Sequence, residues 1–334
     1  MKRLPLLFLS LSCLCLCFSC GGGGSTPRTS VSTNESGQAA DESRGTIGFS
    51  ALSLKNPFFK IISDQLVTDA EEAGFKVIVV DGNDDVSNQS NQVDTFIAQR
   101  VTAIVLNPKD GNAIIPAVKK ANAAGIPVFT CDLPIAEGSD ANVVAHVGTD
   151  NYAGGHLAGQ AMIEAVGELG GEILVLHYKT ATSCIDRVNG FTDEIDEYNA
   201  EHMEGKFQIV AELDGGGSQD VGYKATLDAV QQHPNLVGIF AINDPSALGA
   251  VTALEQSGKA DQIKVVGFDG QLEGKQAIKE GKIYADPIQF PEQMATMTVE
   301  NIVKYLDGEE FDKVHLIETK LYRKADAAQD PDLQ

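Results

Sequence analysis

Short apolar runs rich in β-branched residues alternate with stretches of helical periodicity from residue 46 onward. Between Phe58 and Ala73, for example, apolar residues recur at the three- or four-residue spacing of one helix face. Gly74 and Gly125 each stand just past a predicted helix and before the next apolar run. This βαβ pattern predicts a parallel sheet with helices on both faces. The apolar runs of this first series are Thr46–Phe49, Lys76–Val80, Ala103–Leu106 and Pro127–Thr130.

A second series with the same pattern begins near Asn151. Its strands alternate with predicted helices such as Ala247–Gln256. Two doubly wound α/β halves in tandem are the simplest account of this repetition. The strand-like stretch from Gly308 to Leu321 could cross back between the halves. The apolar runs of the second series are Glu172–Leu176, Gln208–Ala211, Val237–Ala241 and Lys264–Phe268.

Length and charge narrow the class of protein. A chain of 334 residues with 43% hydrophobic content is too long for one typical core and suits two. The chain has 25 Lys and Arg against 47 Asp and Glu, a formal net charge of -22. Such a charge repels polyphosphate and anionic headgroups, so nucleic acid is not an expected partner.

The first twenty residues have the pattern of an export signal. Lys2 and Arg3 precede the apolar stretch Leu4–Phe18, which is too short to span a bilayer. The following Ser19-Cys20 resembles the cleavage box of bacterial lipoproteins, although Cys17 and Phe18 depart from that pattern. We therefore expect a signal peptide over residues 1–20, lipidation of Cys20 and a flexible Gly/Ser-rich tether over residues 21–44. A plain signal peptide cut nearby is the alternative.

Polar and aromatic residues follow the ends of several predicted strands. Ligands bind at this edge of an open α/β sheet, in the crevice outside the carboxyl ends of the strands. A carboxylate accepts two hydroxyl protons, an amide donates and accepts, and a Phe ring covers the C–H face of a sugar. No strand is followed by a dinucleotide or nucleoside-triphosphate fingerprint, so the set predicts recognition of a neutral polyol. The strand ends are Lys55–Phe59, Asn107-Pro108, Cys131-Asp132, Asn243-Asp244 and Phe268–Gly270.

An ordered set of motifs resembles the ribose-binding branch of bacterial periplasmic sugar-binding proteins. The resemblance covers about Thr46 to Tyr322. It implies an α/β fold of two Rossmann-like lobes joined by three hinge strands, with a monosaccharide in the cleft. It further implies no cofactor, a monomer in the periplasm and delivery of the sugar to an ABC transporter permease. The motifs are Asn56–Phe59, Asp132, His146–Asn151, Phe240–Asp244, Ala247–Ala250, Val265–Gly270 and Gln289–Pro291.

The same resemblance implies a set of ligand contacts. Two aromatic rings would flank the sugar, each aspartate would take a pair of hydroxyls, and Arg187 would donate to the ring oxygen or a hydroxyl. Simpler roles stay open: Asp132, Asp269 and Asn243 also suit helix caps or turns. Arg187 could instead lie on a helix surface and pair with Asp186 or Glu194. The implied contacts are Asn56, Phe58, Phe59 and Asp132 in the first lobe, and Arg187, Asn243, Asp269 and Gln289 in the second.

The expected lobe limits are 45–149 plus 290–318, and 150–289 plus 319–324, with a disordered tail over 325–334. Three departures from the ribose pattern leave the sugar open. Leu133 replaces an arginine, Gly215–Ser218 replaces an aromatic between two acidic residues, and Asp286-Pro287 adds a proline before Gln289. A different pentose, a hexose or another polyol therefore remains an alternative to ribose.

The remaining chemistry-bearing residues suggest structural roles. Cys131 and Cys184 are expected to be unpaired, since a disulfide between the lobes would lock the cleft. His146 is expected to be a satisfied structural residue. Asp132, His146 and Cys184 could be combined as acid, base and nucleophile, but no motif of a hydrolase or metal site accompanies them, so no enzyme is expected. A receptor of the same fold that signals to a membrane sensor remains open.

Overall fold

The computed structural model describes residues 43–136 and 138–334. The predicted signal peptide, Cys20 and most of the predicted tether lie outside these residues. Arg44 was assigned to the tether, but it donates to Asp307 at 2.5 Å and its backbone N–H donates to Gly74 at 2.8 Å. Its place is therefore at the start of the fold. Among the described residues, no helix is both long and apolar enough to cross a membrane.

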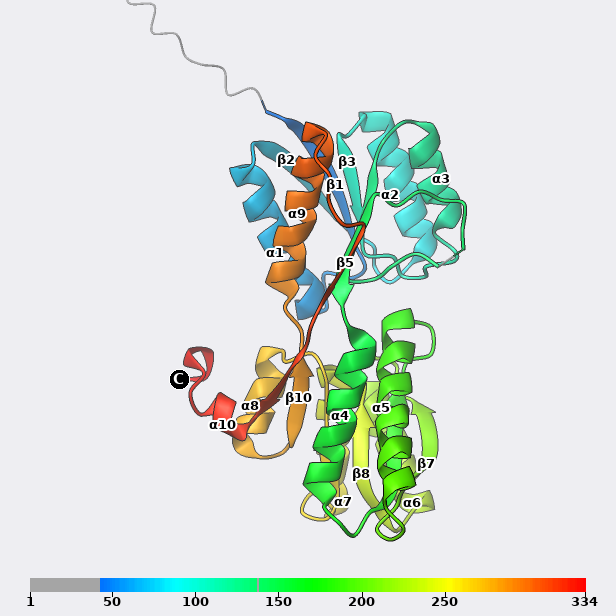
Figure 1. Cartoon of the computed structure of the whole chain (residues 1–334), viewed down its shortest axis with the longest axis vertical. Helices are drawn as coiled ribbons and strands as arrows, with labels where there is room; N and C mark the ends of the chain where they lie inside the picture. Colours follow the sequence, from blue (N-terminus) through cyan, green and yellow to red (C-terminus); the bar gives the residue numbers. More distant parts are fainter. Residues whose placement is uncertain (1–42, 137) are drawn as a thin grey trace, which may run out of the picture. The chain divides into compact units, whose positions relative to one another are not determined.

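The first lobe is a six-stranded parallel sheet in the order β11-β5-β4-β3-β1-β2. Helices α1 and α9 cover one face, and α2 and α3 cover the other (Figure 1). The strands are β1 (Gly45–Ala51), β2 (Phe75–Asp81), β3 (Ala103–Leu106), β4 (Val128–Cys131), β5 (Ala145–Thr149) and β11 (Val314–Ile317). The helices are α1 (Pro57–Glu72), α2 (Val86–Gln99), α3 (Ile115–Ala123) and α9 (Pro291–Asp307).

Local sequence explains how α1 begins and what it buries. The side chain of Asn56 accepts a hydrogen bond from the backbone N–H of Phe58 at 3.0 Å, and Pro57 occupies the first turn, where no N–H is needed. The apolar stripe read from the sequence, including Ile62 and Leu66, is buried against the sheet. After the helix, Gly74 has φ +86°, a conformation that glycine adopts without strain.

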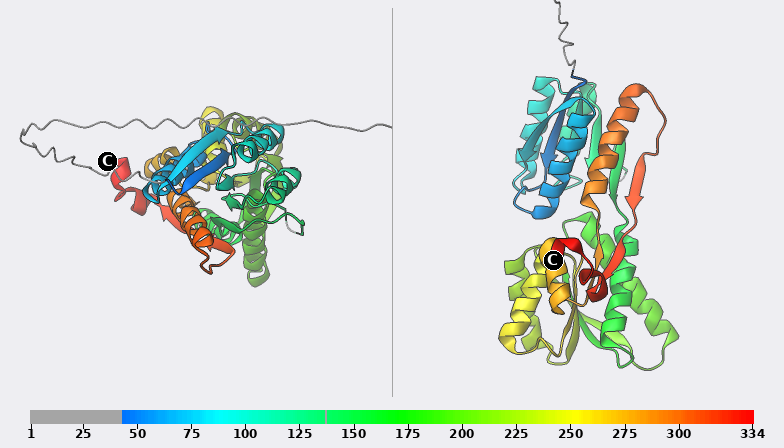
Figure 2. Two further views of the ribbon diagram at one scale, coloured as in Figure 1. Left: turned by 90° about the horizontal axis from the view of Figure 1, so that it is seen from above. Right: turned by 90° about the vertical axis from the view of Figure 1, so that its left-hand side faces the viewer.

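The second lobe contains a four-stranded parallel sheet in the order β7-β6-β8-β9. Helices α4 and α5 pack on one face, and α6, α7 and α8 pack on the other (Figure 2). The strands are β6 (Gly171–His177), β7 (Phe207–Asp214), β8 (Leu236–Ala241) and β9 (Lys264–Val266). The helices are α4 (Asn151–Val166), α5 (Thr182–Glu201), α6 (Gln219–Gln232), α7 (Asp244–Ser257) and α8 (Leu272–Glu280).

Three segments join the lobes (Figure 1). One leads from β5 into α4, and a second leads from β10 (Ala285–Ile288) into α9. The third leads from β11 to β12 (Lys320–Arg323), which pairs with β10 in an antiparallel ribbon. The α/β fold of two lobes is thus confirmed. The ribbon itself was not predicted, because Pro287 within β10 argues against a strand.

The predicted disorder of residues 325–334 is wrong. The segment contains α10 (Lys324–Ala327) and a 3-10 turn, η1 (Pro331–Leu333). Tyr322 donates its hydroxyl to Asp330 at 2.7 Å, and Lys279 of α8 donates to the carbonyl oxygen of Leu333 at 2.5 Å. The tail is polar and has no periodicity of its own, so its order comes from contacts with α8 that the sequence pattern cannot reveal.

Candidate ligand-binding site

A cavity of about 140 Å³ lies between the lobes, at the carboxyl ends of the strands of both sheets. Pockets for drug-sized ligands measure roughly 300–1,000 Å³, so an occupant of this cavity is small. All of the predicted ligand contacts line this cavity. The residues that line it are Leu52, Asn56, Phe58, Phe59, Asp84, Lys109, Asp132, Leu133, Tyr178, Ala181, Ser183, Cys184, Arg187, Gly216, Gly217, Asn243, Asp269 and Gln289.

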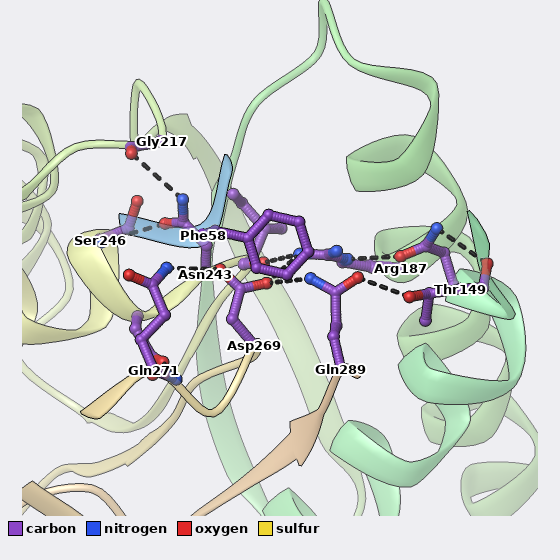
Figure 3. Close-up of polar contacts among 12 residues, drawn as sticks. Phe58, Thr149, Arg187, Gly217, Asn243, Ser246, Asp269, Gln271 and Gln289 are labelled. Atoms are coloured by element: carbon purple, nitrogen blue, oxygen red, sulfur yellow. Dashed lines mark hydrogen bonds and ion pairs between the residues drawn. The ribbon is translucent and has the colours of Figure 1, made fainter. Parts of the chain in front are cut away.

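Arg187 lies at the centre of the polar contacts (Figure 3). Its Nη1 donates to Asp269 Oδ1 at 2.9 Å and to the carbonyl oxygen of Ile242 at 2.8 Å. Its Nε donates to Asn151 Oδ1 at 2.8 Å, and its guanidinium carbon lies 3.9 Å from the centroid of the Phe268 ring. The residue is buried, so the alternative of a surface helix position is wrong. No described residue accepts from Nη2, which leaves this group for a ligand.

The close approach of α4 and α5 places Arg187 in this position. A Cβ atom at Gly155 would lie 2.2 Å from the carbonyl oxygen of Arg187, and one at Gly190 would lie 2.0 Å from the carbonyl oxygen of Tyr152. Any side chain at these two glycines would therefore push the helices apart. Their contact brings Arg187 of α5 to Asn151 at the start of α4.

Three side chains donate hydrogen bonds to the carboxylate of Asp269. Besides Arg187, Nε2 of Gln289 donates to Oδ1 at 2.6 Å and Nε2 of Gln271 donates to Oδ2 at 3.2 Å. Burial raises the pKa of Asp269, while Arg187 and the two amides oppose that rise. The carbonyl oxygen of Pro287 accepts from the backbone N–H of Asp269 at 3.1 Å, so β10 supports the loop that carries this carboxylate.

Gln289 connects the site to a segment that joins the lobes. Its Oε1 accepts a hydrogen bond from Oγ1 of Thr149 at 2.6 Å, while its Nε2 donates to Asp269. Thr149 is the last residue of β5, directly before the connection to α4. Both polar atoms of the Gln289 amide are engaged by the protein, so its first role here is to orient Asp269.

Asp132 differs from Asp269 because no described residue donates a hydrogen bond to its carboxylate. It directly follows β4 with φ +65°, and its side chain is buried on the cavity wall. Burial raises its pKa to about 7, with the Arg187 charge lowering it and the Asp269 charge raising it. A buried carboxylate without donors is costly, so this group is ready to accept hydrogen bonds from a ligand.

The predicted aromatic and amide contacts each have a structural role and also line the cavity. Phe58 and Phe59 meet edge to face, with ring centroids 5.5 Å apart and planes at 86°. Both rings are buried in the first lobe and also line the cavity. Asn56 caps α1, and Asn243 caps α7 by accepting from the N–H of Ser246 at 3.1 Å. For these residues the helix-start role and the place on the cavity wall coexist.

Sequence reasoning missed Lys109, Tyr178 and Asp84, which also line the cavity. Lys109 follows the end of β3, and Tyr178 follows the end of β6. Nζ of Lys109 donates to the hydroxyl of Tyr178, and it lies 3.8 Å from Oδ1 of Asp84. The rule that functional residues follow strand ends applies to Lys109 and Tyr178 too, but neither belongs to the family motifs.

The structure does not assemble the hypothetical catalytic set. His146 lies outside the cavity wall, and its Nδ1 is 2.9 Å from Oγ1 of Thr130. Burial lowers the pKa of His146 to about 4, so the ring is neutral at pH 7. Burial raises the pKa of Cys184 to about 11, which leaves it a thiol. Cys131 and Cys184 are both free, which confirms that they are unpaired.

In the described part of the chain, three side chains lie close enough to share a metal ion: His156, Glu194 and Glu197. They come from α4 and α5, and none of them lines the cavity. The cavity itself therefore offers hydrogen-bonding and stacking groups rather than a cluster of metal ligands.

A cleft between two α/β lobes, lined by carboxylates, amides, a guanidinium and aromatic rings, defines a protein that binds a small polar solute. The chain belongs to the periplasmic binding protein family, because the model of a periplasmic binding protein domain matches residues 47–310. Membership of this family indicates an extracytoplasmic location.

Several relatives are similar over most of their length. A ribose import binding protein of Salmonella typhimurium is 33% identical over 282 residues, which cover 84% of this chain and 91% of the relative. A D-apiose import binding protein of Paraburkholderia graminis is 35% identical over 274 residues, which cover 81% of this chain and 85% of the relative. A solved ABC transporter solute binding protein from Actinobacillus succinogenes with bound D-allose has a TM-score of 0.79 and 27% identity, covering 85% of this chain and 99% of that chain. These relatives are named as binding proteins, not enzymes.

Proposed function

We propose that the protein closes on a monosaccharide, a ribose-like pentose or a related sugar, and delivers it to an ABC importer. The observation that carries the proposal is the Asp132 carboxylate, which is buried, receives no hydrogen bond from the described residues and lies on the wall of a small cavity that also holds Arg187 and Asp269. A sugar hydroxyl supplies the missing donor, and its oxygen can accept from Nη2 of Arg187.

The composition of the wall supports a neutral polyol over an anion or an apolar solute. The charge of Arg187 is balanced by Asp269 at 2.9 Å, so the guanidinium does not demand an anionic ligand. Asp132 adds a further carboxylate, which disfavours anions. Phe58 offers a ring that can cover the C–H face of a sugar. Relatives named for ribose and D-apiose import agree with this chemistry.

Leu133 bears on which sugar is bound. It lines the cavity where the ribose pattern has an arginine, so this wall offers an apolar contact instead of donors. A site that lacks these donors gains nothing from a hydroxyl placed there. The proposal therefore covers deoxy and branched sugars as well as ribose.

Thermal unfolding of the protein against pentoses, hexoses, deoxy sugars and polyols tests the binding, after bound solute has been removed by unfolding and refolding. A ligand at a hundredfold excess over its Kd stabilises the folded state by about 2.7 kcal/mol, which raises Tm by several degrees. Asp269→Asn is expected to abolish the shift, whereas the exposed Asp261→Asn serves as the matched control and keeps it. No shift with any carbohydrate would contradict the proposal.

We further propose a lipid anchor at Cys20 and a monomeric protein that meets an ABC permease at the membrane. The Ser19-Cys20 pair after an apolar stretch supports the anchor. In cells that express the full chain, Cys20→Ser should release the protein from the membrane fraction and stop fatty-acid labelling. Uptake of the identified sugar with and without the chain tests the delivery step.

A further inference from the structure

We propose that Lys109 and Tyr178 form a second part of the ligand site, which determines specificity by donating hydrogen bonds to a ligand oxygen. The ring of Tyr178 forms the cavity wall next to these two donors. The inference rests on the proposed function and deepens it, since it names how the cavity recognises one region of the sugar.

The two residues reach the cavity from different lobes. Lys109 belongs to the turn after β3 in the first lobe, and Tyr178 directly follows β6 in the second. Gln89, which is completely buried, holds the turn: its Oε1 accepts from the N–H of Lys109 at 2.8 Å and its Nε2 donates to the carbonyl oxygen of Asn107 at 2.8 Å. The lysine therefore projects from a fixed backbone rather than from a loose loop.

The glycine-rich loop before α6 lies beside the Tyr178 ring. Gly216 and Gly217 have φ +59° and +58°, and both line the cavity. A Cβ atom at Gly217 would lie 3.8 Å from Cδ1 of Tyr178, in ordinary contact with the ring. Tyr178 thus supplies an aromatic surface to the cavity next to this loop.

The direction of the hydrogen bond shows what the pair offers a ligand. An ammonium group has three donors and no acceptor, so the Tyr178 oxygen must accept from Lys109. The phenolic proton then remains free to be donated elsewhere. Nζ also lies 5.0 Å from the centroid of the Tyr178 ring. Nζ also lies 3.8 Å from Oδ1 of Asp84, its one ion-pair partner among the described residues.

The pair therefore complements the rest of the cavity. Asp132 and Asp269 supply acceptors for hydroxyl protons, whereas Lys109 and Tyr178 supply donors for hydroxyl or ring oxygens. Every sugar hydroxyl both donates and accepts, so a site with both kinds of group can distinguish sugars by where their oxygens lie. The charge on Lys109 strengthens such a bond relative to a neutral one.

Calorimetric titration of whole-chain variants tests the proposal, with the sugar that gives the largest thermal shift as the probe. Tyr178→Phe keeps the ring and removes the hydroxyl, and Lys109→Met keeps most of the stem and removes the charge. Each is expected to weaken binding about tenfold, and the double variant little more than either alone, because the two groups act together. Lys179→Met, at an exposed lysine that pairs with Glu212, is the matched control and should bind as the wild type does.

A deoxy series of the same sugar separates a ligand contact from a contact that only holds the lobes together. If the pair touches the ligand, Tyr178→Phe loses its effect on the one deoxy analogue that lacks the recognised oxygen. An equal loss for every analogue would overturn the proposal in favour of a purely structural latch. Binding within twofold of the wild type in both single variants would also overturn it. If the wild type binds no sugar, the proposed function itself fails, and this inference fails with it.

Discussion

The guanidinium of Arg187 donates to the carboxylate of Asp269 at 2.9 Å, with only 5% and 6% of the two side chains exposed. Their remaining hydrogen bonds come from backbone and amide groups of both the second lobe and the connecting segments. A buried ion pair stabilises a protein only when its hydrogen bonds are satisfied, and removing one partner leaves an unpaired buried charge. Each partner is therefore needed for stability while the other is present, and both fix the shape of the site.

Replacing Arg187 alone should be strongly destabilising. Arg187→Met leaves Asp269 buried without its counter-charge, so we expect the free energy of unfolding to fall by about 3–5 kcal/mol at pH 7. Sugar binding should be lost as well. Urea unfolding measures the first effect and calorimetry the second. The double variant Arg187→Met/Asp269→Asn should regain much of the stability but none of the binding; equal stability of the single and double variants would argue against the buried charge.

Binding should weaken in acid because of Asp132, whose pKa is raised to about 7 mainly by burial. Sugar hydroxyls donate best to the ionised carboxylate, so a bound sugar favours that form. Affinity is expected to be full above about pH 8 and to fall as the pH drops through 7, by up to about tenfold per pH unit. Calorimetry over this range checks the slope. Asp132→Asn should bind more weakly and without this dependence; an unchanged slope in that variant would assign the titration to another group.

Two further carboxyl groups face each other behind the site. Asp244 at the start of α7 and Asp286 in β10 are both buried, and their pKa values are raised chiefly by burial, that of Asp286 to about 6. Three of their four oxygens have no donor among the described residues. When one of the two carboxyl groups is protonated it can donate to the other, so the folded protein retains a proton here.

The stability of the protein should therefore decrease as the pH rises. The folded state binds protons at Asp244 and Asp286 more tightly than the unfolded chain does. The contribution of Asp286 is therefore fully present below about pH 4 and is lost as the pH rises through about 6, and the raised pKa of Asp244 acts in the same direction. We expect the free energy of unfolding in urea to fall over this range. Asp286→Asn should reduce the slope and raise stability above pH 7. A steeper dependence of the unfolding free energy on pH in this variant would contradict the assignment to Asp286. Asp132→Asn serves as the control, because the pKa of Asp132 is also raised.

The two cysteines of the fold should differ in reactivity. Burial raises the pKa of Cys184 to about 11 and that of Cys131 to about 12, so both are poor nucleophiles at pH 8. Cys184 lines the cavity, whereas Cys131 is completely buried. Iodoacetamide should label Cys184 slowly, and more slowly when sugar is bound, but should label Cys131 only on unfolding. Peptide mass spectrometry separates the two; equal rates would contradict this ordering.

Much of the fold could be predicted because its cores depend on local patterns. The apolar stripe of α1 and the β-branched runs of β1 and β3 each carry the period of their own element, and the strand-end rule then indicates the cavity. The β10–β12 ribbon escaped prediction because Pro287 lacks an N–H and the partner strands are far apart in sequence. Its pairing depends on the third connection between the lobes, not on a local signal.

The site residues that belong to sequence motifs could be predicted. Those that reach the site only through the tertiary fold could not. Asn56 and Asp132 stand in recognisable motifs after strands. A lysine or tyrosine after a strand is ordinary on a protein surface, so Lys109 and Tyr178 gain meaning only when the two lobes bring them together. Likewise, nothing near Gln289 in the sequence indicates that its amide bonds to Thr149.

The ordered end of the chain also provides a way to observe motion. Because α10 and η1 pack on the second lobe while β2 belongs to the first, the exposed residues Asp332 and Lys76 lie on different lobes. A fluorescent donor at one position and an acceptor at the other would convert the hinge angle into energy transfer. With the two fluorophores attached at these positions, the protein would act as a reagentless sensor for its own sugar.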